Sequence, residues 1–129
     1  MISIADPELG TEEKERVEQV LDSGMLADGP EVREFEAEFA EYCDAAHGVG
    51  TSNGTTALHA TLEALGIGDG DQVLTTPFSF IATANAIRLA GADPVFADID
   101  PVTYNLDPDA ARQVAQTADV DAIIAVHLY

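Results

Sequence analysis

Residues 51–58, Thr-Ser-Asn-Gly-Thr-Thr-Ala-Leu, predict the end of a strand, a tight Asn-Gly turn and the first turn of a helix. Gly54 tolerates positive φ and lets a ligand approach the backbone closely. Free N–H groups at a helix N-terminus, with hydroxyl side chains beside them, suit a bound phosphate. An ordinary capped helix has the same composition, because Ser, Thr and Asn are common N-caps. The stretch by itself leaves both interpretations open.

The sequence on either side of this stretch alternates between strands and helices. We expect strands at 47–51, 72–75, 94–98 and 122–126, and helices at 54–65, from about 81 to 91, and at 108–118. Strands that alternate with helices of this length form right-handed βαβ units. We therefore predict an α/β fold with three layers and a mostly parallel sheet, in which the apolar residues 122–126 form a buried central strand.

Two helices are expected before this region. Thr11 precedes two glutamates, as at many helix starts, and Gly24 can end that helix. Pro30 can open a second helix, in which apolar residues recur at helical spacing up to Tyr42. We assign residues 1–30 to an N-terminal arm and helix, and residues 31–129 to an incomplete α/β domain.

The charge of the chain limits its partners. Twenty-four acidic residues face five basic ones, for a net charge of −19. Nucleic acids and anionic membranes would be repelled, so neither is expected as a partner. No apolar run approaches the roughly 18 residues of a membrane span, and residues 1–7 lack the pattern of a signal peptide. We expect a cytoplasmic protein, and the acid-rich, lysine-poor composition favours a halophilic source.

No metal site is expected. The single cysteine excludes an internal disulfide and a cysteine-based metal cluster, and Cys43 is expected in the core. Asp98 and Asp100 are interpreted as a polar strand end. The only lysine, Lys14, lies among glutamates on a solvated helix and is not expected to act as a nucleophile.

A dinucleotide is one phosphate ligand to consider. The segment Gly48-Val49-Gly50 and Gly54 resemble a dinucleotide-binding glycine pattern. An apolar strand should precede that pattern and an acidic residue should follow the next strand, where this chain has Thr75-Thr76-Pro77. Both differences count against a dinucleotide.

Phe80 favours a different ligand. In an open α/β sheet, ligands bind beyond the carboxyl ends of the strands, and Phe80 follows the strand predicted at 72–75. Its ring can stack on a planar ring of a ligand, although a core aromatic at a helix start is the simpler alternative. A phosphate site followed one βα unit later by an aromatic side chain favours pyridoxal phosphate.

Several separate segments, in one order and spacing, resemble the DegT/DnrJ/EryC1/StrS family. They include Ser52 to Leu58, Phe80 to Ala86, Asp98-Ile99-Asp100 and Val126-His127-Leu128-Tyr129. The members of this family are sugar aminotransferases among the fold-type-I pyridoxal-phosphate enzymes. The resemblance implies that the chain is the N-terminal part of the large domain of such an enzyme. Asn53, Thr56 and Thr76 depart from the usual family pattern.

The resemblance also implies roles for individual residues. The backbone N–H groups of Thr55 and Thr56, beside Gly54, would bind the phosphate of the cofactor, and Phe80 would stack on its pyridine ring. His127 would border the cofactor, and Gly29 would border the substrate. The family's Schiff-base lysine lies beyond Tyr129. No catalytic residue is therefore expected in this chain, and the chain alone is expected to be inactive.

For the whole protein, the resemblance implies transfer of an amino group from an amino-acid donor to a nucleotide-linked keto-sugar, in polysaccharide biosynthesis. A homodimer is expected of the whole protein. Two alternatives stay open. One is a dehydratase of the same family, in which histidine replaces the lysine. The other is a non-catalytic α/β module that binds a nucleotide or phosphate.

Overall fold

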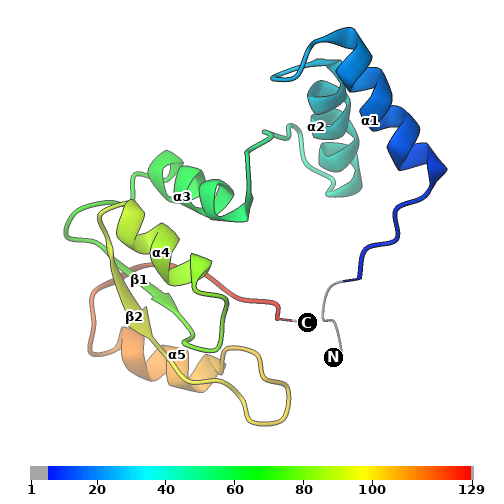
Figure 1. Cartoon of the computed structure of the whole chain (residues 1–129). Coiled ribbons are helices and arrows are strands. Elements are labelled where there is room, and N and C mark those ends of the chain that lie inside the picture. Colours follow the sequence, from blue (N-terminus) through cyan, green and yellow to red (C-terminus); the bar gives the residue numbers. More distant parts are fainter. Residues whose placement is uncertain (1–5, 129) are drawn as a thin grey trace. The chain divides into compact units, whose positions relative to one another are not determined.

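The computed structural model describes residues 6–128, with one unit that ends at Gly50 and a second that begins at Thr51. The first unit contains two helices, α1 (Thr11–Ser23) and α2 (Pro30–Tyr42) (Figure 1). The second unit contains, in chain order, α3 (Gly54–Ala64), β1 (Gln72–Thr75), α4 (Ala82–Leu89), β2 (Asp93–Phe96), α5 (Pro108–Ala115) and β3 (Val120–Ile123). Within residues 6–128, no helix is both long and apolar enough to cross a membrane.

The two N-terminal helices begin and end at the residues that the sequence predicts. At the start of α1, the Glu13 carboxylate accepts a hydrogen bond from the Gly10 N–H at 2.7 Å. The helix ends at Gly24, whose φ of 70° lies in the left-handed region that favours glycine. Pro30 occupies the first turn of α2, where its missing N–H costs nothing.

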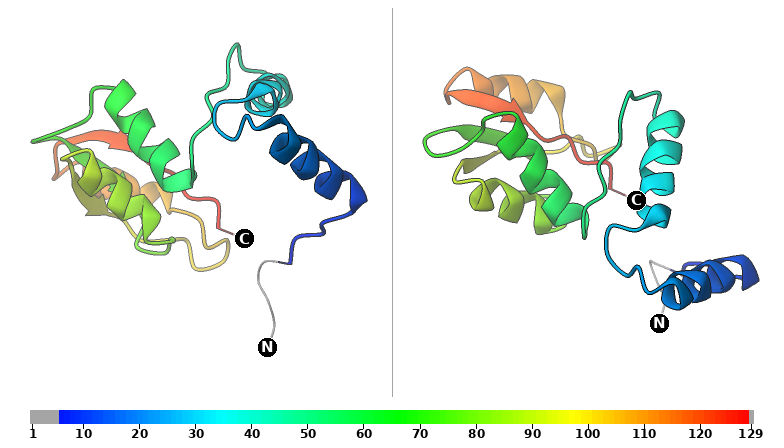
Figure 2. Two further views of the ribbon diagram at one scale, coloured as in Figure 1. Left: turned by 45° about the horizontal axis from the view of Figure 1, so that its top comes forward. Right: turned by 90° about the horizontal axis from the view of Figure 1, so that it is seen from above.

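The second unit has three layers, as predicted. All strand pairs are parallel, and the strand order is β2-β1-β3. Helices α3 and α4 cover one face of the sheet, and α5 covers the other (Figure 2). Successive residues of β1 pack on opposite faces of the sheet. Val73 packs with Leu62 of α3 and Ile87 of α4, whereas Leu74 packs with Ala111 of α5.

The buried central strand is β1, not the segment 122–126. Val73, Leu74 and Thr75 are fully buried. The strand expected at 122–126 spans Val120–Ile123 instead and is an edge strand among the described strands. Within this strand, the Asp121 carboxylate accepts the Gln72 N–H at 2.8 Å, beside the irregularity in the β1–β3 register.

Residues 47–51 do not form the expected strand. The Gly50 N–H donates to Glu36 Oε1 at 2.7 Å, so the segment is bonded to α2 and not to a sheet. A Cβ on Gly48 would lie 2.5 Å from the Glu36 carbonyl oxygen. Gly48 therefore allows the backbone of residues 47–51 to pack closely against the backbone of α2. In a dinucleotide site, by contrast, a glycine at this position would allow a phosphate to approach.

The expected burial of Cys43 is also wrong. Helix α2 ends at Tyr42, and Cys43 is an exposed residue at its C-cap. Its backbone N–H still donates to the Phe39 carbonyl oxygen at 3.0 Å. The helical hydrogen bonding therefore reaches Cys43, but Cys43 is not covered by other side chains. Phe39, one turn earlier, is itself half exposed.

Candidate functional site

The N-terminus of α3 lies at the carboxyl-end side of the sheet and is capped by Asn53. Asn53 Oδ1 accepts the backbone N–H of Thr56 at 2.9 Å and lies 3.2 Å from the Thr56 hydroxyl. Asn53 has an extended φ of −170° and Gly54 is not among the residues with positive φ, so the turn does not use the positive φ that Gly54 would tolerate. The capped-helix interpretation of residues 51–58 is therefore correct, and it accounts for one of the free donors of the helix.

Two donors remain available at this helix end. Within residues 6–128, the backbone N–H groups of Gly54 and Thr55 have no hydrogen-bond acceptor. A Cβ added to Gly54 would meet nothing within 4 Å, so the approach to these groups is open. The hydroxyls of Ser52 and Thr56 lie 3.3 Å apart beside them. An anion here would be bound by backbone N–H groups and by the positive end of the helix dipole.

The loop between β1 and α4 carries Phe80. Its start is fixed by Thr76, a buried residue whose hydroxyl accepts the Phe78 N–H at 3.1 Å. Its end is fixed by Ser79 and Thr83, whose hydroxyls lie 2.7 Å apart. The side chain of Phe80 is 72% exposed. Phe80 is therefore not a core aromatic, and its ring is accessible to a planar ligand.

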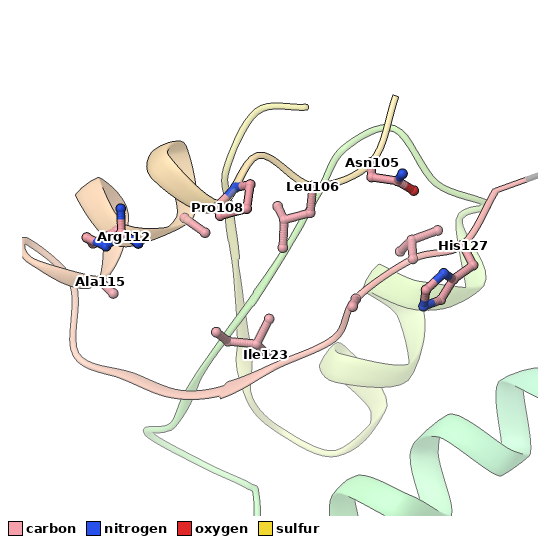
Figure 3. Close-up of a pocket in the computed structure, with 10 residues that line it drawn as sticks. Asn105, Leu106, Pro108, Arg112, Ala115, Ile123 and His127 are labelled. Carbon is pink, nitrogen blue, oxygen red and sulfur yellow. The ribbon is translucent and has the colours of Figure 1, made fainter. Parts of the chain in front are cut away.

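His127 follows β3, and a hydrogen bond from β1 fixes the residue directly after β3. The Thr75 hydroxyl donates to the Ile124 carbonyl oxygen at 3.0 Å. Three residues later, His127 lines a cavity of about 480 Å³ together with Leu106, Ile123 and residues of α5 (Figure 3). No hydrogen bond joins His127 to Thr55, Thr56 or Phe80 in the part of the chain that the structure describes. All four residues lie in the second unit, and His127 lies beside the cavity next to α5.

Gly29 lies in the first unit, at the N-cap of α2. A Cβ at this position would lie 3.0 Å from the Met25 carbonyl oxygen. Close packing of the backbone therefore explains this glycine locally. Its expected place beside the substrate remains a prediction.

One feature of this sheet end is not evident from the sequence. The loop after β2 is closed by a bridge between Ile99 and Leu106 and by the Asp100 carboxylate, which accepts the N–H groups of Val102 and Thr103 at 2.9 and 2.7 Å. These hydrogen bonds lower the pKa of the Asp100 carboxyl group. Tyr104 follows with a φ of 61°. The Asp-Pro pair at 100–101 indicates a turn, but no local pattern predicts the conformation of Tyr104.

No group of histidine, cysteine, aspartate and glutamate side chains within residues 6–128 could hold a metal ion. The candidate donors at the strand ends are backbone N–H groups and hydroxyls, which suit an anion. At the polar strand end, the carboxylates of Asp98 and Asp100 instead accept hydrogen bonds from backbone N–H groups.

The model of the DegT/DnrJ/EryC1/StrS aminotransferase family matches residues 7–129. The chain belongs to this family. It is 50% identical over 113 residues to the "pleiotropic regulatory protein" of Geobacillus stearothermophilus, covering 88% of this chain and 30% of that protein. It is 43% identical over 129 residues to GDP-perosamine synthase of Caulobacter vibrioides, covering 99% of this chain and 34% of the enzyme.

Solved structures of the family have the same fold. The PLP-form of Spr1654 from Streptococcus pneumoniae matches with a TM-score of 0.80 and 30% identity, over 87% of this chain and 29% of that one. The chain thus spans about a third of the length of the relatives that it matches. The three-layer unit described above is accordingly part of a pyridoxal-phosphate-dependent aminotransferase fold.

Proposed function

We propose that the whole enzyme uses pyridoxal phosphate to transfer an amino group from an amino-acid donor to a nucleotide-linked keto-sugar. The observation that carries this proposal is the pair of free N–H groups at Gly54 and Thr55, in the same unit as the exposed ring of Phe80. GDP-perosamine synthase, which by name acts on a nucleotide-linked sugar, supports the substrate class. The PLP-form of Spr1654 supports the cofactor.

The residues of the second unit fit the phosphate of this cofactor. Gly54 and Thr55 would donate their N–H groups. The N–H of Thr56 is already donated to Asn53, so Thr56 would contribute its hydroxyl by turning it from Asn53 Oδ1 toward the phosphate. Ser52 Oγ is a further donor beside them. Since the chain carries a net charge of −19, short-range donors of this kind, together with the helix dipole, must bind the phosphate against the overall charge.

Phe80 would cover one face of the pyridine ring. When bound, pyridoxal phosphate supplies an electron sink for removal of a proton from the carbon that bears the amino group. The exposed phenyl ring would exclude water from that face and orient the cofactor. His127 would border the cofactor, and Gly29 the substrate. Residues 31–129 would belong to the large domain of the enzyme, with 1–30 as its arm and first helix.

Titration of the 129-residue chain, followed by its ¹H–¹⁵N spectrum, tests the phosphate site. Pyridoxal phosphate and inorganic phosphate should both shift the amide signals of Gly54 and Thr55, and pyridoxal without phosphate should not. Gly54→Ala places a methyl group in the open approach and should weaken both shifts while α3 remains helical. Thr61→Ala, seven residues further along α3, is the matched control. Equal shifts with pyridoxal would contradict the proposal.

The aminotransferase and dehydratase activities differ in a residue outside this chain. We propose that a lysine follows beyond Tyr129 in the whole protein, as in the aminotransferases of the family. The full reading frame tests this: histidine at that position would make the enzyme a dehydratase, and neither residue would exclude both. The 129-residue chain alone should give no stoichiometric, borohydride-trappable adduct with pyridoxal phosphate.

We further propose that the whole enzyme is a cytoplasmic homodimer from a halophilic source. The acid-rich composition supports the last point, because charges are strongly screened in concentrated salt. Unfolding of the chain in molar potassium chloride tests it directly. Stability should rise with salt, and a stability that is highest in dilute buffer would contradict it.

A further inference from the structure

Backbone hydrogen bonds join the two sides of the loop from Asp98 to Asp107. The Asp107 N–H donates to the Asp98 carbonyl oxygen at 3.0 Å, and the Asp100 N–H donates to that of Asn105 at 2.9 Å. The Tyr104 N–H donates to the Asp100 carbonyl oxygen, also at 2.9 Å. These bonds, together with the Asp100 carboxylate turn, determine the backbone from Asp100 to Asn105.

Tyr104 has an unfavourable backbone conformation in this loop. Its φ of 61° is in the left-handed region, which a residue with a bulky side chain rarely occupies. Such a conformation costs free energy and persists only where the surrounding hydrogen bonds impose it. Asn and Gly adopt it with less strain. A role for tyrosine at this position must therefore come from the contacts of its ring.

The ring of Tyr104 packs against Phe78. The two ring centroids lie 6.0 Å apart with an angle of 35° between the planes. Tyr104 is 60% exposed and Phe78 is also partly exposed, so the pair buries too little surface to be a core contact. The pair instead joins the loop after β2 to the loop after β1, at the end of the sheet where the candidate site lies.

Phe78 leads directly to Phe80. Its N–H is bonded to the buried Thr76, and Ser79 is bonded to Thr83 at the start of α4. Phe78 thus lies between two hydrogen-bonded points of a short loop, and its ring contacts Tyr104 from the loop after β2. Only Ser79 separates Phe78 from Phe80 along the chain.

We propose that Tyr104 is a positioning residue: its ring, presented by the closed loop at 98–107, braces Phe78 and thereby orients Phe80. The inference rests on the proposed stacking of Phe80 on the cofactor ring. It adds to that proposal a residue from a different βα connection, which does not itself touch the cofactor.

Three variants of the 129-residue chain test the role of Tyr104. Tyr104→Asn and Tyr104→Gly remove the ring but suit the left-handed backbone, so the melting temperature should be unchanged or higher. Hydrogen exchange at the Phe78 amide should nevertheless become several-fold faster, because the loop loses its brace. Tyr104→Phe keeps the ring and should restore slow exchange.

A binding measurement separates this proposal from the proposed function. With pyridoxal phosphate, Tyr104→Asn should reduce the shift of the Phe80 ring signals and leave the phosphate-induced shifts of Gly54 and Thr55 unchanged. Unchanged exchange and an unchanged Phe80 response in Tyr104→Asn would overturn the positioning role alone. If Gly54 and Thr55 do not respond in the unsubstituted chain, the proposed function fails, whereas the exchange measurement still decides the role of Tyr104.

Discussion

Asn53 Oδ1 accepts the backbone N–H of Thr56 at 2.9 Å, which leaves the N–H groups of Gly54 and Thr55 as the free donors of α3. One short side chain thus stabilises the helix and also determines which of its donors a ligand can use. An amide at the N-cap adds no charge, so it does not repel an anion beside it.

Replacement of this cap should destabilise the second unit. Asn53→Ala removes the acceptor for Thr56 N–H and should lower the free energy of unfolding by about 1 kcal/mol, as measured by urea denaturation. Asn53→Ser keeps an acceptor and should retain most of the stability. Equal stability of the alanine variant and the unsubstituted chain would show that the cap is not needed.

Gly48 should tolerate no side chain. Gly48→Ala places a Cβ 2.5 Å from the Glu36 carbonyl oxygen, and the required backbone shift should cost about 1–3 kcal/mol in the first unit. Hydrogen exchange of the α2 amides would report this loss as faster opening. Gly54→Ala, where the added methyl group meets nothing within 4 Å, is the matched control and should leave α2 unchanged.

The Asp100 carboxyl group should titrate below its ordinary pKa of 3.8, because it accepts the N–H groups of Thr103 and Val102. A pKa that is lower in the folded state contributes stability above the unfolded-state pKa and loses it as the pH falls through the folded-state pKa. A ¹³C titration of the carboxyl carbon measures this directly. Asp100→Asn should remove this acid-dependent part of the stability, and a carboxyl group that titrates at or above 3.8 would contradict the prediction.

Phe80 should matter for binding and not for stability. Its side chain is largely exposed, so Phe80→Leu should change the free energy of unfolding by no more than about 0.5 kcal/mol. The same variant should weaken the response of the chain to pyridoxal phosphate and leave its response to inorganic phosphate unchanged. Phe78→Leu serves as a comparison at the neighbouring ring. A loss of both responses in Phe80→Leu would indicate a general effect on the loop.

Local chemistry explains why most of the helices and the bounds of the strand at 72–75 are predictable, although its central place in the sheet is not. Gly24 and Pro30 mark helix ends by their own backbone preferences, which do not depend on distant residues. The adjacent apolar residues Val73 and Leu74 of β1, rather than an alternating pattern, match a sheet covered on both faces. The sequence also predicts the start of α3, since it depends on residues within a few positions.

Other features depend on contacts between distant segments. Gly48-Val49-Gly50 resembles a strand or a phosphate turn by its residues, but Glu36 of α2 decides its conformation. Residues 122–126 are apolar enough for a central strand, yet the strand spans Val120–Ile123 and pairs with β1 alone among the described strands.

The sequence by itself determined the α/β class, the family and the start of the helix at Gly54, because backbone preferences and the order of motifs depend on residues close together in the chain. Only the tertiary structure decided the left-handed backbone of Tyr104 and its contact with Phe78. That contact joins two loops whose meeting depends on the parallel pairing of β1 with β2. The physical reason is that strand pairing brings together residues that no local preference relates.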